Sequence, residues 1–156
     1  HGVFRRQRQM CIRDRKSSFD QVIKDKIKQN QIEKLVDFIG WIKESDIPNY
    51  LSITKLGLSP LHKNIHHDTT YANKVFQYIS IGCPVVSSNV IAQSELVKKY
   101  EIGVIFEDNN VFDLSDKIIE LHNDKNLYSR LKQNCLDSIE KLNNSVISNQ
   151  LISIYE

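Results

Sequence analysis

One stripe of a predicted helix combines residue types that suit the binding of phosphates and sugars. The spacing of apolar residues predicts a helix over 70–81, on which Thr70, Asn73, Lys74 and Gln77 share a face. A hydroxyl, two carboxamides and a cation on one face match diphosphate oxygens and sugar hydroxyls. The alternative is that Lys74 and Gln77 form a solvated face and that Thr69 or Thr70 only caps the helix.

The opposite stripe of the same helix is apolar. Ala72, Val75, Phe76 and Ile79 recur at steps of three and four, which is typical of a helix face that packs against a core. We therefore expect the polar stripe to point away from the core.

A polar loop over 60–69 precedes this helix and follows a predicted strand that ends at Ser59. In open α/β sheets, ligands lie beyond the carboxyl ends of strands, and binding residues concentrate in the loops there. We therefore expect ligand-binding residues in this loop.

The same loop region contains a group of potential metal ligands. His62, His66, His67 and Asp68 carry imidazole and carboxylate groups, which bind many divalent metals. Because loop spacing does not fix their geometry, we expect hydrogen-bonding roles and no metal; a metal site is the alternative.

The elements that must position these residues alternate along the chain. Short apolar runs predict strands over 35–39, 56–59, 84–88 and 103–106. Amphipathic stretches predict helices over 17–31, 46–54, 70–81, 91–100, 111–123, 125–142 and 145–155.

This alternation predicts the α/β class with a parallel sheet, built as one layered unit without internal repeats. A doubly wound domain usually has five or six parallel strands, whereas four are predicted here. We therefore expect an incomplete, Rossmann-like doubly wound parallel sheet whose first strands are missing.

Composition narrows the function classes. The 156 residues are 40% hydrophobic and 26% charged, which is typical of one globular domain with a core. No apolar run is long enough for a membrane span, and no signal peptide is recognisable, so we expect a cytoplasmic protein. The five glycines form no Walker or G-x-G-x-x-G pattern, which excludes a dinucleotide-binding half. Cys83 and Cys135 are expected to be buried reduced thiols.

The basic residues of the chain gather at its start. Residues 1–16 hold six of the 21 lysines and arginines but one aspartate, so the rest of the chain is net negative although the total is +2. Residues 1–15 resemble a translated sequencing adapter. We therefore divide the chain into a non-native terminal segment over 1–16 and one partial domain over 17–156. A basic arm that binds nucleic acid or a membrane surface is the alternative.

Several short motifs together resemble the retaining glycosyltransferases of family four, or group one, which have two Rossmann-like domains (GT-B). The resemblance covers about 35–156. Its nucleotide-sugar signature lies at 70–78 and 82–86, and further matches lie at 36–41, 47–50, 94–97, 103–106 and 114–121.

The resemblance implies the fold and the donor site. It implies that the domain is the carboxy-terminal, donor-binding half of a GT-B enzyme that binds a nucleoside diphosphate sugar. Gln77 stands where the family commonly has a glutamate that binds the donor ribose, and Thr69 where a second glutamate contacts the donor sugar. The E-x7-E pattern is therefore absent, although a subgroup with Gln at this position matches Asn64, His66, Asp68, Thr70 and Lys74. The donor site implied is His66, Asp68, Thr69, Thr70, Asn73, Lys74 and Gln77, and no catalytic residue is assigned.

The resemblance also implies a reaction and partners. A hexosyl group would pass from the donor to an acceptor hydroxyl with retained anomeric configuration, without a metal cofactor, as in polysaccharide biosynthesis. The partners implied are the nucleoside diphosphate sugar and a missing amino-terminal GT-B domain, with no nucleic acid and with peripheral membrane contact of the whole enzyme. We expect this chain alone to be inactive and to bind nucleotide weakly.

Two other functions remain open. A nucleotide-sugar epimerase on the same scaffold would use a similar ribose contact but different sugar-site residues. A non-enzymatic α/β module, such as a receiver-like domain, would need acidic residues at a strand's carboxyl end. Here the predicted strands run into Gly40-Trp41 and Ser87-Ser88 instead.

Overall fold

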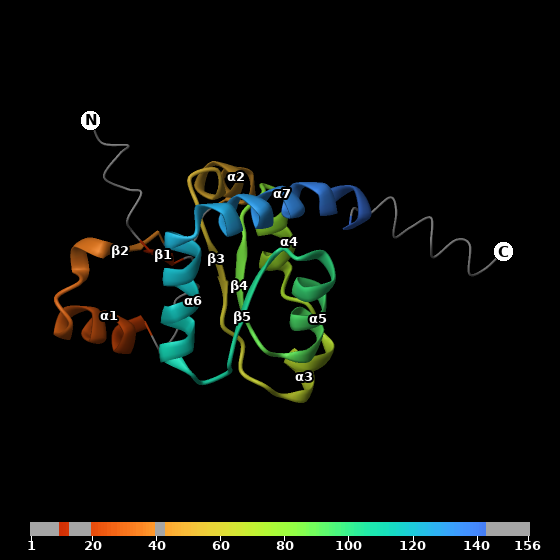
Figure 1. Ribbon diagram of the computed structural model, residues 1–156. Coiled ribbons are helices and arrows are strands. Elements are labelled where there is room, and N and C mark those ends of the chain that lie inside the picture. Colours follow the sequence, from red (N-terminus) through yellow and green to blue (C-terminus); the bar gives the residue numbers. More distant parts are fainter. Residues whose placement is uncertain (1–9, 13–19, 40–42, 143–156) are drawn as a thin grey trace. The chain divides into compact units, whose positions relative to one another are not determined.

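The computed structural model describes residues 10–12, 20–39 and 43–142, which form two compact units, 1–53 and 54–156 (Figure 1). The predicted helix over 145–155 lies outside the described residues. No helix in the described ranges is long and apolar enough to cross a bilayer.

The first unit contains a parallel pair of short strands. β1 (Met10–Ile12) pairs with β2 (Val36–Phe38), with Met10 opposite Val36. The helical elements of this unit are α1 (Asp20–Gln29), η2 (Glu33–Leu35), η3 (Glu44–Asp46) and α2 (Ile47–Leu51). Pro48 lies in the first turn of α2, where its missing N–H leaves no helical hydrogen bond unmade.

β1 lies inside the segment over 1–16, for which the sequence predicts no strand. It pairs with β2, which the sequence predicts in the same sheet as the three later strands. Because strand partners depend on backbone pairing between distant segments, the composition of residues 35–39 did not indicate this partner. The division at residue 16 stays a prediction.

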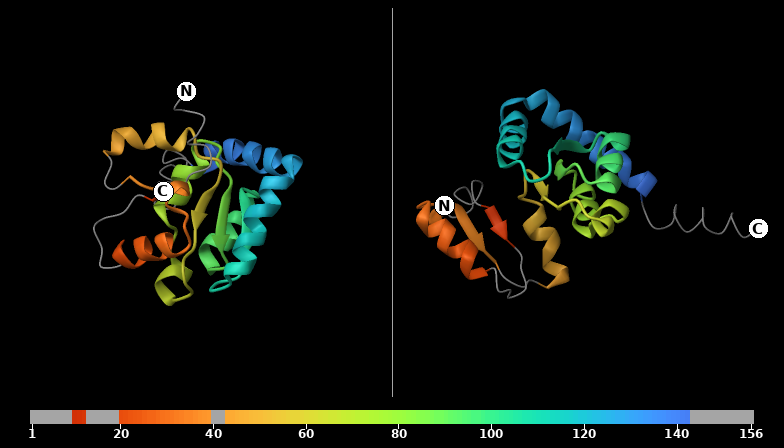
Figure 2. Two further views of the ribbon diagram at one scale, coloured as in Figure 1. Left: turned by 90° about the vertical axis from the view of Figure 1, so that its left-hand side faces the viewer. Right: turned by 90° about the horizontal axis from the view of Figure 1, so that it is seen from below.

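The second unit is a three-stranded parallel sheet with helices between its strands (Figure 2). The strands lie in the order β3, β4, β5, and all three predicted strands are confirmed. Their bounds are β3 (Gly57–Ser59), β4 (Val85–Ser88) and β5 (Gly103–Phe106). The helices of the unit are α3 (Ile65–Thr69), α4 (Asn73–Ile79), α5 (Ile91–Tyr100), α6 (Val111–Asn123) and α7 (Lys125–Leu142).

Both faces of this sheet are covered. Successive strand residues point to opposite faces, so Val85 and Val86 of β4 belong to different cores. Val85 packs with residues of α4 and α5, and Val86 with Leu121 of α6. α7 reaches both cores, through Cys135 and Leu131 respectively. The predicted doubly wound α/β arrangement is confirmed for this unit.

Candidate functional site

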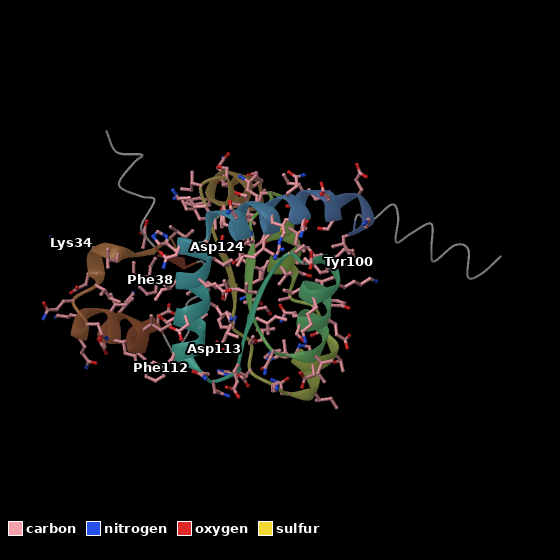
Figure 3. The ribbon with its side chains drawn as sticks, viewed as in Figure 1. Lys34, Phe38, Tyr100, Phe112, Asp113 and Asp124 are labelled. Atoms are coloured by element: carbon pink, nitrogen blue, oxygen red, sulfur yellow. The ribbon has the colours of Figure 1, made fainter. Side chains whose placement is uncertain are left out.

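The carboxyl ends of β3, β4 and β5 lie at one edge of the sheet, because the three strands are parallel. The connections that follow them carry the predicted site residues after β3, Asn89 after β4 and Asp108 after β5. Figure 3 marks this edge by Phe112 and Asp113 at the start of α6, and the opposite edge by Asp124 after its end.

The predicted helix over 70–81 begins later and is preceded by a separate short helix. Thr70 and Ala72 have extended backbones, so the chain makes α3 and α4 as two pieces. Thr69 and Thr70 donate their hydroxyls to the backbone carbonyls of Ile65 and His66, both at 2.7 Å. These carbonyls belong to the first two residues of α3, and hydroxyl bonds to them compete with the backbone hydrogen bonds that would continue the helix.

Asn64 explains why part of the predicted loop is helical. Its side-chain oxygen accepts a hydrogen bond from the backbone N–H of His67 at 2.9 Å, which is an N-cap. His66, Asp68 and Thr69 therefore lie on α3 rather than in an irregular loop. The sequence did contain this signal, because Asn is among the favoured N-cap residues.

Asp68 contacts a different helix. Its Oδ1 accepts a hydrogen bond from the backbone N–H of Ile91 at 3.0 Å, at the first residue of α5. The N-cap residue of α5, Val90, offers no side-chain acceptor, so Asp68 supplies one from α3. The other carboxylate oxygen of Asp68, Oδ2, can accept further hydrogen bonds.

α4 presents the two faces that the sequence predicts. Val75 and Ile79 are buried, and Ala72 and Phe76 pack against the same core, which confirms the apolar stripe. Asn73, Lys74 and Gln77 recur at steps of one and three residues on the other side of the helix.

Lys74 is a cation that has no counter-charge among the described residues. Its side chain is half-buried, and within the described part of the chain it has no hydrogen-bond or ion-pair partner. Burial lowers the pKa of Lys74 from the ordinary lysine value, because an ammonium group loses hydration there. An anion beside Lys74 would replace that hydration.

The rings of His62 and His67 make hydrogen bonds, and the three histidines of the segment do not converge on one point. Nδ1 of His62 lies 2.9 Å from Asp108 Oδ1, and Nδ1 of His67 lies 2.7 Å from the carbonyl of His62. The His66 ring packs against that of His67, with 5.6 Å between centroids. The described residues contain no cluster of three or more metal-binding side chains. That the reaction needs no metal stays a prediction.

Two features of this edge were missed by sequence reasoning. The first is Asp108, whose carboxylate contacts His62 and Lys63 and whose backbone N–H donates to Asn89 Oδ1 at 3.0 Å. The second is a buried bond from Ser59 Oγ to Gln93 Oε1, 2.7 Å long. A polar run over 107–110 directly after a strand was the available signal for Asp108.

An open depression lies at the opposite edge of the sheet. It is lined by Glu120, Asn123, Asp124, Lys125 and Asn126, at the junction of α6 and α7 where the strands begin. The predicted donor-site residues on α3 and α4 do not contribute to it. At the predicted edge, the arrangement offers a cation, carboxamides and hydroxyl oxygens, which can bind a phosphorylated and hydroxylated ligand.

Comparisons with solved structures support the fold. The C-terminal domain of a glycosyl transferase group 1 family protein (LpcC) from Francisella tularensis is 22% identical and has a TM-score of 0.67, with 80% of this chain and 62% of that chain covered. HepE from Anabaena, crystallised with UDP-glucose, is 18% identical with a TM-score of 0.76, and 94% of this chain and 40% of that chain are covered.

Comparisons with sequences identify the family. A chitobiosyldiphosphodolichol beta-mannosyltransferase of Candida glabrata is 31% identical over 117 residues, which are 75% of this chain and 25% of that protein. The chain thus spans about a quarter of the length of the curated relatives that it matches. The family described as "Glycosyl transferases group 1" matches residues 5–136. Because this match covers most of the chain, the protein belongs to the group 1 glycosyl transferases.

Proposed function

We propose that α3 and α4 bind a nucleoside diphosphate sugar and that the whole protein transfers its sugar to an acceptor hydroxyl. The observation that carries the proposal is Lys74, a half-buried cation with no partner among the described residues, in the first turn of the helix α4 and in the connection that follows the carboxyl end of β3. A diphosphate is an anion that would compensate the burial of this ammonium group.

The neighbours of Lys74 fit the rest of such a donor. Gln77, half-buried one turn further along α4, can accept from and donate to ribose hydroxyls with the same amide. Asn73, exposed in the first turn, offers a second amide for sugar hydroxyls. The side chains of Asn73 and Gln77 form no hydrogen bonds with other described residues, so both amides remain available.

The α3 segment offers acceptors as well as donors. Thr69 and Thr70 use their hydroxyl hydrogens on carbonyls of α3, so their oxygens can still accept hydrogen bonds from a sugar. Asp68 Oδ2 is a further acceptor, and the exposed His66 ring can contact the donor from the same helix. We assign these four residues to the sugar and phosphate side of the donor.

In the proposed reaction the glycosidic bond to the diphosphate breaks and a bond to an acceptor oxygen forms on the same face of the sugar. The leaving diphosphate gains negative charge, and Lys74 would stabilise that charge electrostatically without a metal. The acceptor site and the remaining reacting groups are assigned to an amino-terminal GT-B domain. A cytoplasmic location and peripheral membrane contact complete the proposal.

A titration tests the donor site directly. The ¹⁵N-labelled chain is titrated with UDP-glucose, and we expect shifts of the amide signals of residues 66–77. Lys74→Met should weaken binding by about tenfold, which corresponds to the loss of one charged hydrogen bond. Lys98→Met, which removes an exposed lysine of α5, is the matched control. Unchanged amide signals at millimolar UDP-glucose would refute the donor site.

Product analysis on the whole enzyme tests the reaction. A glycosylated acceptor whose anomeric coupling in proton NMR equals that of the donor would establish retaining transfer. An isomerised donor formed without an acceptor would show that the protein is an epimerase, and an inverted anomeric centre would overturn retention.

A further inference from the structure

Both carboxylate oxygens of Asp108 contact the segment that precedes α3. Oδ1 lies 2.9 Å from Nδ1 of His62, and Oδ2 accepts a hydrogen bond from the backbone N–H of Lys63 at 2.9 Å. Asp108 lies after β5 and the two contacted residues lie after β3, so these bonds join two separate connections at the carboxyl edge of the sheet.

Asp108 is itself fixed to the third connection. Its backbone N–H donates to Asn89 Oδ1, which lies between β4 and α5. Only 11% of the Asp108 side chain is exposed, whereas 72% of the His62 side chain is. The bond from the Lys63 N–H, and then the contact with His62, hold the pKa of Asp108 below its ordinary value. The carboxylate is therefore charged at neutral pH and binds both donors as an anion.

These bonds lie directly before α3, the helix that carries three of the seven proposed donor-binding residues. Lys63 is followed by Asn64, the N-cap of α3, so fixing the Lys63 amide fixes the point at which α3 begins. The segment has two further attachments, from Ser88 Oγ to the Leu61 carbonyl at 2.6 Å and from the Ile91 N–H to Asp68. Along the segment, the bonds of Asp108 to His62 and Lys63 lie between the attachment at Leu61 and the attachment at Asp68.

We propose that Asp108 is a positioning residue for donor binding, which holds the start of α3 so that His66, Asp68 and Thr69 face the donor. The proposal rests on the donor site of the proposed function. Among the described residues, the Asp108 carboxylate makes its hydrogen bonds to His62 and Lys63, which precede α3, and Asp108 is not one of the proposed donor-binding residues. Asp108 would therefore affect the binding of the donor by fixing the backbone position of residues 62–64.

Hydrogen exchange tests the positioning without any ligand. Asp108→Ala removes both contacts, and we expect exchange of the Lys63 amide to rise by about tenfold. Asp108→Asn should stay closer to the wild type than Asp108→Ala does, because its amide oxygen can still accept the hydrogen bond from the backbone N–H of Lys63. Asp116→Ala, an exposed aspartate of α6, is the matched control and should change nothing.

UDP-glucose binding tests whether the positioning matters. The dissociation constant should rise about fivefold in Asp108→Ala, less in Asp108→Asn and not in Asp116→Ala. Asp108→Ala should lower the urea midpoint relative to Asp116→Ala, because the carboxylate and its two bonds are lost. Binding is therefore measured without urea, where the circular dichroism of the variant must equal that of the wild type, which separates positioning from a loss of folding. If the wild type binds and Asp108→Ala binds equally well, the positioning role is wrong while the donor site stands. If the wild type does not bind, the donor site itself is wrong, and the positioning role is rejected with it.

Discussion

Ser59 and Gln93 form a hydrogen bond of 2.7 Å between two side chains that are both fully buried. Ser59 ends β3 and Gln93 lies in the first turn of α5, so the bond joins the carboxyl edge of the sheet to the helix that follows the next strand. Gln93 Nε2 has no partner among the described residues. The amide of Gln93 thus depends on Ser59 for the one side-chain bond that it makes in this part of the chain.

Replacing Ser59 should therefore destabilise the protein. In Ser59→Ala the buried amide oxygen of Gln93 loses its donor, and a buried polar group without a partner costs about 1–3 kcal/mol. The free energy of unfolding is measured by urea titration. Ser115→Ala, at an exposed position of α6, is the control and should change it by less than about 0.5 kcal/mol. Equal effects of the two variants would show that the Ser59 bond adds no stability.

Asp68 should stabilise α5 from outside that helix. Its carboxylate accepts the Ile91 N–H and places a negative charge at the amino end of α5. Asp68→Ala should cost about 1 kcal/mol in unfolding free energy, as the loss of an N-cap does, and Asp68→Asn should cost less because an acceptor remains. Hydrogen exchange of the Ile91 amide measures the local effect. Faster exchange in Asp68→Asn than in Asp68→Ala would contradict this role.

The helices with long, regular apolar spacing were the most predictable part of the fold. α5, α6 and α7 have the bounds that the sequence predicts, because their apolar positions repeat over two or more turns. The break between α3 and α4 was not predicted. It depends on hydroxyl-to-carbonyl bonds of Thr69 and Thr70, and the same residue types are also common at the start of a helix.

The site shows a similar division. The polar stripe was predicted from helical spacing for Thr70, Asn73, Lys74 and Gln77. Asn73, Lys74 and Gln77 do lie on α4, whereas Thr70 lies before that helix with an extended backbone, so its place on the stripe was wrong. The contacts of Asp108 join residues that are 45 and 46 positions apart. Such contacts depend on which connections the sheet order brings to one edge, and no local pattern carries that information.

Lys74 should lower stability at neutral pH compared with an apolar residue. Burial lowers its pKa in the folded chain, so folding disfavours the ammonium form. Below the lowered pKa this penalty is complete, and it declines as the pH rises towards the unfolded value. Lys74→Met should therefore be as stable as the wild type or more stable at pH 7, within about 1 kcal/mol, and its advantage should shrink at alkaline pH. Urea titrations from pH 7 to alkaline pH measure the difference in unfolding free energy between Lys74→Met and the wild type, with Lys98→Met as control. If the advantage of Lys74→Met grew with pH, the lowered pKa of Lys74 would be contradicted.

Cys83 and Cys135 should resist alkylation in the folded protein. Both are buried and free, and burial raises the pKa of each to about 12. Only the thiolate reacts, so at pH 8 we expect reaction with iodoacetamide at least about a hundredfold slower than in the urea-unfolded chain. Mass spectrometry of the peptides measures the extent of alkylation at Cys83 and at Cys135 separately.

The same pKa shifts make stability depend on pH in the alkaline range. In the unfolded chain these thiols ionise near 9, the ordinary value, whereas in the folded chain they stay neutral up to about 12. Their contribution to stability is therefore complete below pH 9 and is lost as the pH rises from 9 to 12. Cys135→Ala should reduce the slope of stability against pH in this window, measured by urea titration. A slope equal to that of the wild type would show that the Cys135 thiol already ionises in the folded state.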